Sequence, residues 1–168
     1  LPAKANALKI SRHFTESGKD PFDKLSWSKR DVEIRNFDGT VAFSMKGVTL
    51  PDNYSQVAAN VLAQKYLRKA GIPKKLRAVK EKAVPSWLQK SVPDLKSMED
   101  LPENEKFGEE IDGKQTFRRL AGTWTYWGWK HGYFASEDDA RSYFDEMSYM
   151  LASQMVSPNS PQWFNTGL

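Results

Sequence analysis

The sequence predicts an α+β fold that is predominantly helical and carries one small β-hairpin. Two observations predict it. Apolar residues recur at helical spacing in three segments, and they alternate with polar residues in one segment that also contains turn residues. A chain of 168 residues is long enough for one domain with a hydrophobic core, with or without an additional arm.

The first twenty residues mix Lys, Ser, Gly and Asp without apolar periodicity. Such a segment has few apolar side chains to bury, so residues 1–20 are predicted to form a flexible arm. Ordered structure is expected to begin near Phe22, and residues 21–168 are assigned to the domain.

A β-hairpin is predicted shortly after residue 30. Asp38-Gly39 supplies the turn chemistry. The strands are indicated by alternating apolar residues, which are Val32, Ile34, Val41 and Phe43. A third short extended piece is expected at 48–50, where Pro51 ends it.

The next element is predicted to be a helix that begins between Asp52 and Ser55 and ends at Gly71, with Pro73 beyond it. Ser or Asp at the start and Gly followed by Pro at the end are typical of helix boundaries. Its expected apolar stripe consists of Val57, Ala58, Val61, Leu62 and Tyr66.

The sequence KKLRAVKEK at 74–82 is expected to continue the basic end of this helix. It fits either a patch for phosphate or RNA or a solvated face, and the lack of a Gly-rich loop or interleaved aromatics favours the solvated face. Residues 84–114 contain three prolines and then an acidic run. They are predicted to form a connecting segment with at most short helical turns, held in place by Trp87 and Leu88.

A second helix is predicted over 114–130, and its buried face is expected to contain Phe117, Leu120, Ala121, Trp124 and Trp127. The aromatics that follow it, Trp129, Tyr133 and Phe134, fit core packing or a base-stacking platform, and their helical spacing favours the core. His131 is expected at the helix C-terminus, where it interacts with the helix dipole.

A third helix is predicted over 137–156, with Ser136 as N-cap and carboxylates in its first turn. Its buried stripe is expected to consist of Ala140, Tyr143, Phe144, Met147, Leu151 and Met155. Ser148 falls on the opposite side of the helical wheel, where an added charge is expected to cost little.

Composition excludes several classes of function. The net charge of +4 accompanies 21 acidic residues, so a dedicated nucleic-acid binder is not required. There is no cysteine, which removes disulfides, thiolate metal sites and thiol catalysis from this chain. No apolar run is long enough to span a membrane and no secretory signal begins the sequence, so a soluble cytoplasmic protein is expected.

The sequence NSPQWFNTGL at 159–168 is the candidate site. Pro161 is expected to keep Ser160 out of the helical region, and Trp163 and Phe164 to anchor the segment in a core. A loop of this kind holds a hydroxyl and backbone N–H groups in fixed positions, which suits an anionic group such as phosphate. The alternative is a turn that closes the preceding helix.

Three segments carry a resemblance to a known family. FDKLSWSKRDVEIRNFDGTVAFSMKGVTLP at 22–51, YSQVAANVLAQKYLRKAGIPKKLR at 54–77 and the whole of 121–168 resemble the N-terminal region of adenosylcobalamin-dependent (class II) ribonucleotide reductases. The segments occur in the order and with the spacing of that family. Together they cover nearly everything after about residue 20.

The resemblance implies conversion of ribonucleotides to 2′-deoxyribonucleotides by thiyl-radical chemistry, with adenosylcobalamin as cofactor. It implies a ten-stranded α/β barrel that carries the radical cysteine, the redox cysteines and the acid–base carboxylate, all expected after Leu168. In the family, the serine of an Asn-Ser-Pro loop holds substrate phosphates at the barrel entrance. Ser160 matches it, with Asn159 beside it, and Asn165 matches the following Phe-Asn-x-Gly.

The sequence is therefore interpreted as the N-terminal portion of a ribonucleoside-diphosphate reductase, inactive alone. It contributes the substrate-phosphate loop and a scaffold, and no cofactor, metal or catalytic residue is assigned within it. The expected partners are the remainder of the reductase and the ribonucleotide substrate, with a homo-oligomer as the complete enzyme. The alternative is a free-standing basic helical module that binds nucleic acid or a protein partner.

Overall fold

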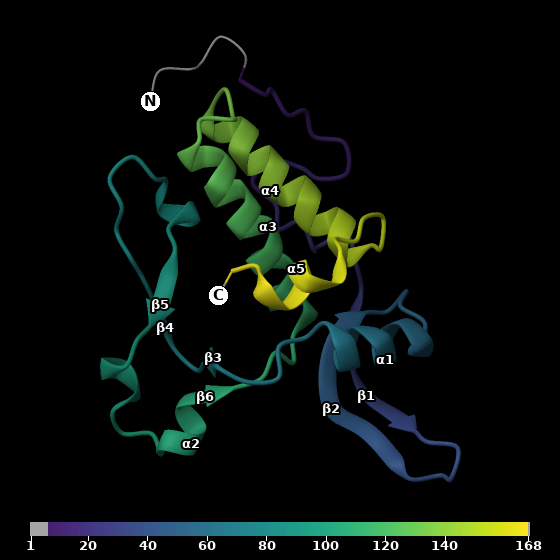
Figure 1. Ribbon diagram of the computed structural model, residues 1–168. Helices are drawn as coiled ribbons and strands as arrows, with labels where there is room; N and C mark the ends of the chain where they lie inside the picture. Colours follow the sequence, from purple (N-terminus) through teal and green to yellow (C-terminus); the bar gives the residue numbers. More distant parts are fainter. Residues whose placement is uncertain (1–6, 168) are drawn as a thin grey trace.

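The computed structural model describes residues 7–167, and the part of the predicted arm at 1–6 lies outside the described residues. The fold is α+β, but helical residues are a minority of the chain, so the prediction of a predominantly helical fold overstates them. Two long helices lie side by side, a β-hairpin extends away from them, and a short helix near the C-terminus lies between these parts (Figure 1).

The hairpin consists of β1 (Trp27–Arg35) and β2 (Val41–Pro51), paired antiparallel from Trp27 opposite Pro51. Gly39 has a φ of 84° in the connecting turn, as the Asp38-Gly39 sequence predicts. The extended piece expected separately at 48–50 is the continuation of β2. Register shifts in the pairing let the long strands bend, so one hairpin spans both predicted pieces.

Helix α1 (Gln56–Lys65) begins as predicted, since the Ser55 hydroxyl accepts a hydrogen bond from the Ala58 N–H at 3.1 Å. The predicted stripe was partly wrong, because Val57 is 73% exposed and Val61 is also exposed. The buried residues of the helix are Ala59, Leu62 and Ala63. Small alanine side chains allow α1 to lie close to the hairpin. The helix therefore buries its alanine-containing face, and the face with the larger valine side chains stays exposed.

Residues 72–108 form an excursion of short elements, which are β3 (Ile72–Pro73), β4 (Leu76–Ala78), η1 (Ser86–Leu88), β5 (Ser91–Pro93), η2 (Lys96–Met98), α2 (Glu103–Lys106) and β6 (Phe107–Gly108). β3 pairs with β6 and β4 with β5, all antiparallel. The basic segment 74–82 was predicted to continue a helix, but it contains strand β4. Pro73 precedes it, and proline disfavours helical continuation through this point.

Helix α3 (Gly113–Lys130) buries Phe117, Leu120 and Ala121 in the core as predicted. Trp127, which was predicted to be buried with them, is exposed. His131 is the C-cap, as predicted from its position. The start of α3 is tied to the hairpin, because the Thr49 N–H in β2 donates to the carbonyl oxygen of Ile111 at 2.8 Å.

Helix α4 (Glu137–Ala152) is capped by Ser136 as predicted, whose hydroxyl accepts from the Asp139 N–H at 3.1 Å. It is buried on two faces. Ala140 and Leu151 lie in the apolar interior, but the second buried face is polar and contains Ser142, Asp145, Glu146 and Ser148. Ser148 is 0% exposed, so the expectation of a solvent-facing position was wrong.

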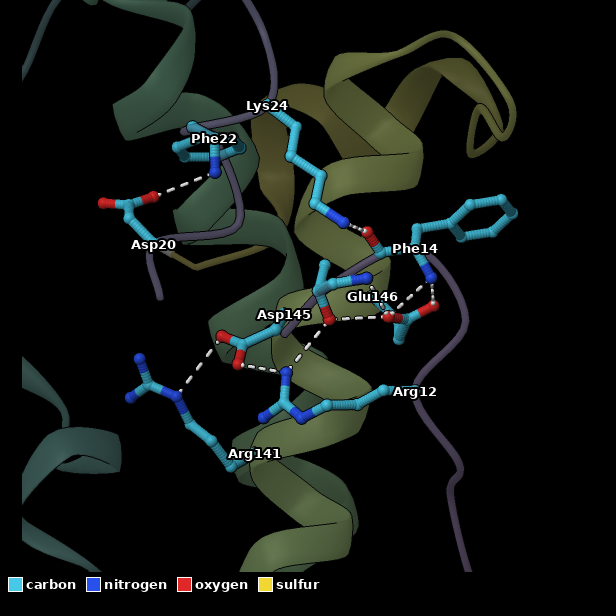
Figure 2. A network of polar contacts seen from close by, with 9 residues as sticks. Arg12, Phe14, Asp20, Phe22, Lys24, Arg141, Asp145 and Glu146 are labelled. Carbon is cyan, nitrogen blue, oxygen red and sulfur yellow. Dashed lines mark hydrogen bonds and ion pairs between the residues drawn. The ribbon is translucent and has the colours of Figure 1, made fainter. Parts of the chain in front are cut away.

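Residues 7–20, assigned by sequence to a flexible arm, cover this polar face of α4 (Figure 2). Glu146 accepts hydrogen bonds from the Phe14 N–H at 3.0 Å and the Thr15 N–H at 2.8 Å. Arg12 pairs with Asp145 at 2.8 Å. The segment has little apolar surface to bury, and its backbone donors are satisfied by carboxylates of α4 instead.

Candidate functional site

The candidate site lies at the start of α5 (Ser160–Asn165), which follows α4 after a short loop. Asn159 is the N-cap, with φ −60° and ψ 147°. Pro161 was expected to hold Ser160 outside the helix. The extended backbone falls one residue earlier instead, because Pro161 occupies the first turn, where a missing N–H costs nothing.

The backbone N–H groups at this helix start are already in use. The Ser160 N–H donates to Oδ1 of Asn159 at 2.9 Å, and the Gln162 N–H donates to the carbonyl oxygen of Asn159 at the same distance. Pro161 has no N–H. The hydroxyl is therefore the only hydrogen-bond donor of Ser160 that remains available to a ligand.

Tyr66 completes this corner of the molecule. Its phenol oxygen lies 3.4 Å from the Ser160 Oγ, although 94 positions separate the two residues. Its ring packs on the indole of Trp163, with centroids 5.4 Å apart. Tyr66 was predicted to belong to the apolar stripe of the preceding helix, and its half-buried ring does pack against the core cluster. The residue is also the C-cap of α1, where the chain leaves the helix and turns the phenol toward α5.

The other predicted residues of the segment separate into different environments. Trp163 is 4% exposed and belongs to the core cluster, as predicted, whereas Phe164 is 40% exposed. Asn165 is exposed at the last position of α5, at the opposite end of the helix from Asn159 and Ser160. The structure thus brings Asn159 and Ser160 together, but does not bring Asn165 to them.

The C-terminal end of α5 is held by Arg119 of α3, which sequence analysis missed. Its guanidinium donates to the carbonyl oxygens of Trp163, at 2.7 Å, and Thr166. The same guanidinium binds the carboxylate of Glu110 at two points, 2.7 and 2.9 Å. Glu110 is fully buried, so this ion pair is formed away from water.

Gly167 lies directly against this arginine. It has a φ of 80°, and a Cβ at this position would lie 2.7 Å from both the Arg119 Cγ and the Thr123 Oγ1. Only glycine fits such a position without a shift of its neighbours. Gly167 of the motif therefore has a structural reason in the packing of Arg119 and Thr123.

Comparison with known proteins identifies the family. A model of the N-terminal region of class II vitamin B12-dependent ribonucleotide reductases matches residues 28–154. The chain belongs to this family. Vitamin B12-dependent ribonucleotide reductases of Bradyrhizobium diazoefficiens and Agrobacterium fabrum are 52% and 53% identical to it over 161 residues. The corresponding protein of Streptomyces avermitilis is 32% identical over 166 residues.

These matches cover 96%, 96% and 98% of the chain, but the chain spans only 13%, 13% and 14% of the three reductases. It therefore corresponds to an N-terminal portion of a class II reductase. The sequence contains no cysteine, which is consistent with a portion that lacks the catalytic cysteines implied by the resemblance.

No metal or cofactor site is identified among the described residues. Between residues 7 and 167 no group of three or more His, Cys, Asp or Glu side chains could hold a metal ion. A cavity of about 450 Å³ lies between the arm, η1 and α4. Arg118 and Arg141 in its wall are already paired with Asp20 and Asp145.

None of the described helices has the length and apolar character needed to cross a membrane.

Proposed function

We propose that this chain is the part of a class II ribonucleotide reductase that presents the Ser160 hydroxyl to the phosphates of a ribonucleotide substrate. The observation that carries the proposal is the exposed Ser160 at the start of α5, with its hydroxyl beside the phenol of Tyr66. Two hydroxyls 3.4 Å apart are able to donate to one phosphate group. Asn159 supports the site by capping α5 and fixing the Ser160 backbone.

The mode of binding differs from a helix-terminus phosphate site. Because the first N–H groups of α5 are bonded to Asn159, the region offers side-chain hydroxyls and not a cluster of amides. A hydroxyl that donates to a charged oxygen contributes about 1.5–3 kcal/mol. That suffices to orient a substrate whose remaining contacts come from other parts of the protein. Asn165 stays a weaker candidate, since it lies at the far end of the helix.

The complete protein is proposed to reduce ribonucleotides to 2′-deoxyribonucleotides in the cytoplasm, as a homo-oligomer. Adenosylcobalamin bound to the remainder of the protein would supply the radical chemistry. We assign the barrel and its cysteines to that remainder, which is also the first partner of this chain. The chain alone, without cysteine, is proposed to be inactive.

The alternative of a free-standing basic module loses its support. The family match includes the basic segment 74–82. Glu81, inside that segment, pairs with Lys130 of α3 at 2.9 Å and with Lys90 at 3.7 Å, so the segment is held by contacts within the chain.

The proposal is tested with Ser160→Ala in the full-length reductase. Loss of one hydrogen bond to phosphate should raise KM for the ribonucleotide about tenfold or more, with kcat much less affected. Pro158, half-buried in the loop before α5, offers a control as Pro158→Ala, which removes no donor. A lower melting temperature of Ser160→Ala without a change in KM would show that the hydroxyl only closes a turn.

A further inference from the structure

We infer that Arg119 and Glu110 are positioning residues that set the place and direction of α5, and through it the Ser160 hydroxyl. The inference rests on the proposed function, because it gives these residues a role in substrate binding that they perform without touching the substrate. Neither residue belongs to the 159–168 motif.

Arg119 acts on α5 as a side-chain cap. The last carbonyl oxygens of a helix receive no hydrogen bond from an N–H of the same helix. A cation at this end also interacts favourably with the helix dipole. Arg119 donates to two such oxygens, those of Trp163 and Thr166. A helix of six residues has little stability of its own, so contacts of this kind decide where it lies.

Glu110 fixes the direction of the Arg119 guanidinium. Its two carboxylate oxygens accept from Nε and from one Nη of Arg119 in a two-point pair, which constrains the plane of the guanidinium. One of these nitrogens also donates to the Trp163 carbonyl oxygen, so the Glu110 carboxylate fixes the position of a group that binds α5 directly. A lysine in place of Arg119 would keep the charge without this planar geometry.

Glu110 also fixes the segment that carries Tyr66. The Arg68 N–H donates to a Glu110 carboxylate oxygen at 3.0 Å, and the Glu110 N–H donates back to the Arg68 carbonyl oxygen at 2.8 Å. Arg68 lies two residues after Tyr66. One buried carboxylate therefore connects both sides of the Ser160 and Tyr66 hydroxyl pair, from α5 through Arg119 and from the end of α1 through Arg68.

This arrangement predicts a kinetic signature. Arg119 contacts the end of α5 that is remote from Ser160, so its loss should shift the hydroxyl and leave other substrate contacts in place. The expected effect is a rise in KM for the ribonucleotide, with a smaller change in kcat.

The test uses the full-length reductase with Arg119→Lys and Glu110→Gln, which keep most of the side-chain volume, and Arg119→Ala as the stronger change. Arg118→Ala is the matched control, because Arg118 is the neighbouring arginine on α3 but pairs with Asp20 of the arm. We expect Arg119→Lys to raise KM about tenfold, comparable to the loss of one hydrogen bond to a charged group, and Arg118→Ala to leave KM unchanged.

A double-mutant cycle with Ser160→Ala shows whether Arg119 acts through Ser160. If it does, KM of the Arg119→Lys, Ser160→Ala double variant equals that of Ser160→Ala alone. If the KM increases of the two single variants multiply in the double variant, the inference is overturned, since Arg119 would then affect substrate binding independently of Ser160. Should Arg119→Ala fail to fold, the cycle with Arg119→Lys still decides.

The two proposals fail in different ways. If Ser160→Ala raises KM while Arg119→Lys and Glu110→Gln behave as wild type, the positioning role is wrong and the phosphate contact stands. If Ser160→Ala leaves KM unchanged, the assignment of Ser160 to substrate phosphate is wrong. The proposed effect of Arg119 on KM is then wrong as well, because it acts through Ser160. Hydrogen exchange of the α5 amides then tests the structural step alone. Faster exchange in Arg119→Lys supports the hold on α5, and unchanged exchange overturns it.

Discussion

The backbone N–H of Thr15 donates a hydrogen bond to Oε1 of Glu146 at 2.8 Å, across 131 positions of sequence. The Thr15 hydroxyl and the Phe14 N–H donate to the same carboxylate. Residues 7–20 thus complete the fold by donating hydrogen bonds to buried carboxylates of α4. These hydrogen bonds, and not apolar contacts, hold the segment there.

Glu146→Ala should destabilise the chain by about 2–3 kcal/mol, because it leaves two backbone donors and a hydroxyl without their charged acceptor. Asp138→Ala, at an exposed carboxylate on the same helix, should cost under about 1 kcal/mol, its helix-dipole contribution. Urea unfolding of both variants gives the comparison. Equal losses would mean that the arm is not held by Glu146.

Acid should weaken the same contact. Burial acts to raise the pKa of Glu146, but hydrogen bonds from Thr15 and from the Phe14 and Thr15 amides outweigh it, so the pKa lies below its ordinary 4.5. The pKa of Asp139 is also lowered, by the Ser136 hydroxyl and the Ile10 N–H. The unfolded chain binds these protons at higher pH, so the stabilisation is present above the unfolded pKa values and is lost as pH falls through the folded ones.

Unfolding free energies measured from about pH 7 to about pH 3 should therefore decline at the acid end, and less steeply in Glu146→Gln, which has no carboxyl to protonate. Identical pH slopes for the two proteins would contradict the assignment of Glu146 to this titration.

Ser148→Asp should cost several kcal/mol, because Ser148 is fully buried and its hydroxyl has no hydrogen-bond partner among the described residues, so the new carboxylate would be a buried charge. Ser157→Asp, at an exposed serine in the loop after α4, should change stability by less than about 0.5 kcal/mol. Thermal melts of the two variants decide, and a mild effect at Ser148 would show that the polar face of α4 is open to solvent.

Gly167→Ala should be more costly than Gly71→Ala, although both glycines have a φ near 80°. The backbone strain of about 1–2 kcal/mol is common to the two changes. Only at Gly167 would the new Cβ meet Arg119 and Thr123, since Gly71 has open space around the same position. The difference between their unfolding free energies isolates the contact, and a difference of zero would contradict the packing of Arg119 on Gly167.

Local chemistry predicted several parts of the fold well. Asp38-Gly39 marked the hairpin, and Ser55 and Ser136 marked the helix starts that their hydroxyls cap. His131 was placed correctly at the end of α3. These features depend on neighbours within a few residues, so a single sequence contains the information needed to find them.

Long-range contacts could not be predicted from the same patterns. Ser148 looked solvent-facing because its position opposite the apolar stripe of the helical wheel does not show that the fold buries a second face of α4. Tyr66 was predicted to pack with the core, which it does, but its contact with Ser160 depends on where α1 and α5 meet. Glu110 lay in an acidic run that is typical of exposed linkers, and only the fold brings Arg119 to it.

The central claim is that Ser160 binds substrate phosphate, and the most direct measurement compares the affinity of a ribonucleotide with that of the nucleoside lacking phosphates. Both are titrated into the full-length reductase and its Ser160→Ala variant. The account predicts that the variant binds the ribonucleotide about tenfold more weakly and the nucleoside equally well. An equal loss for both ligands, or no loss for either, would contradict it.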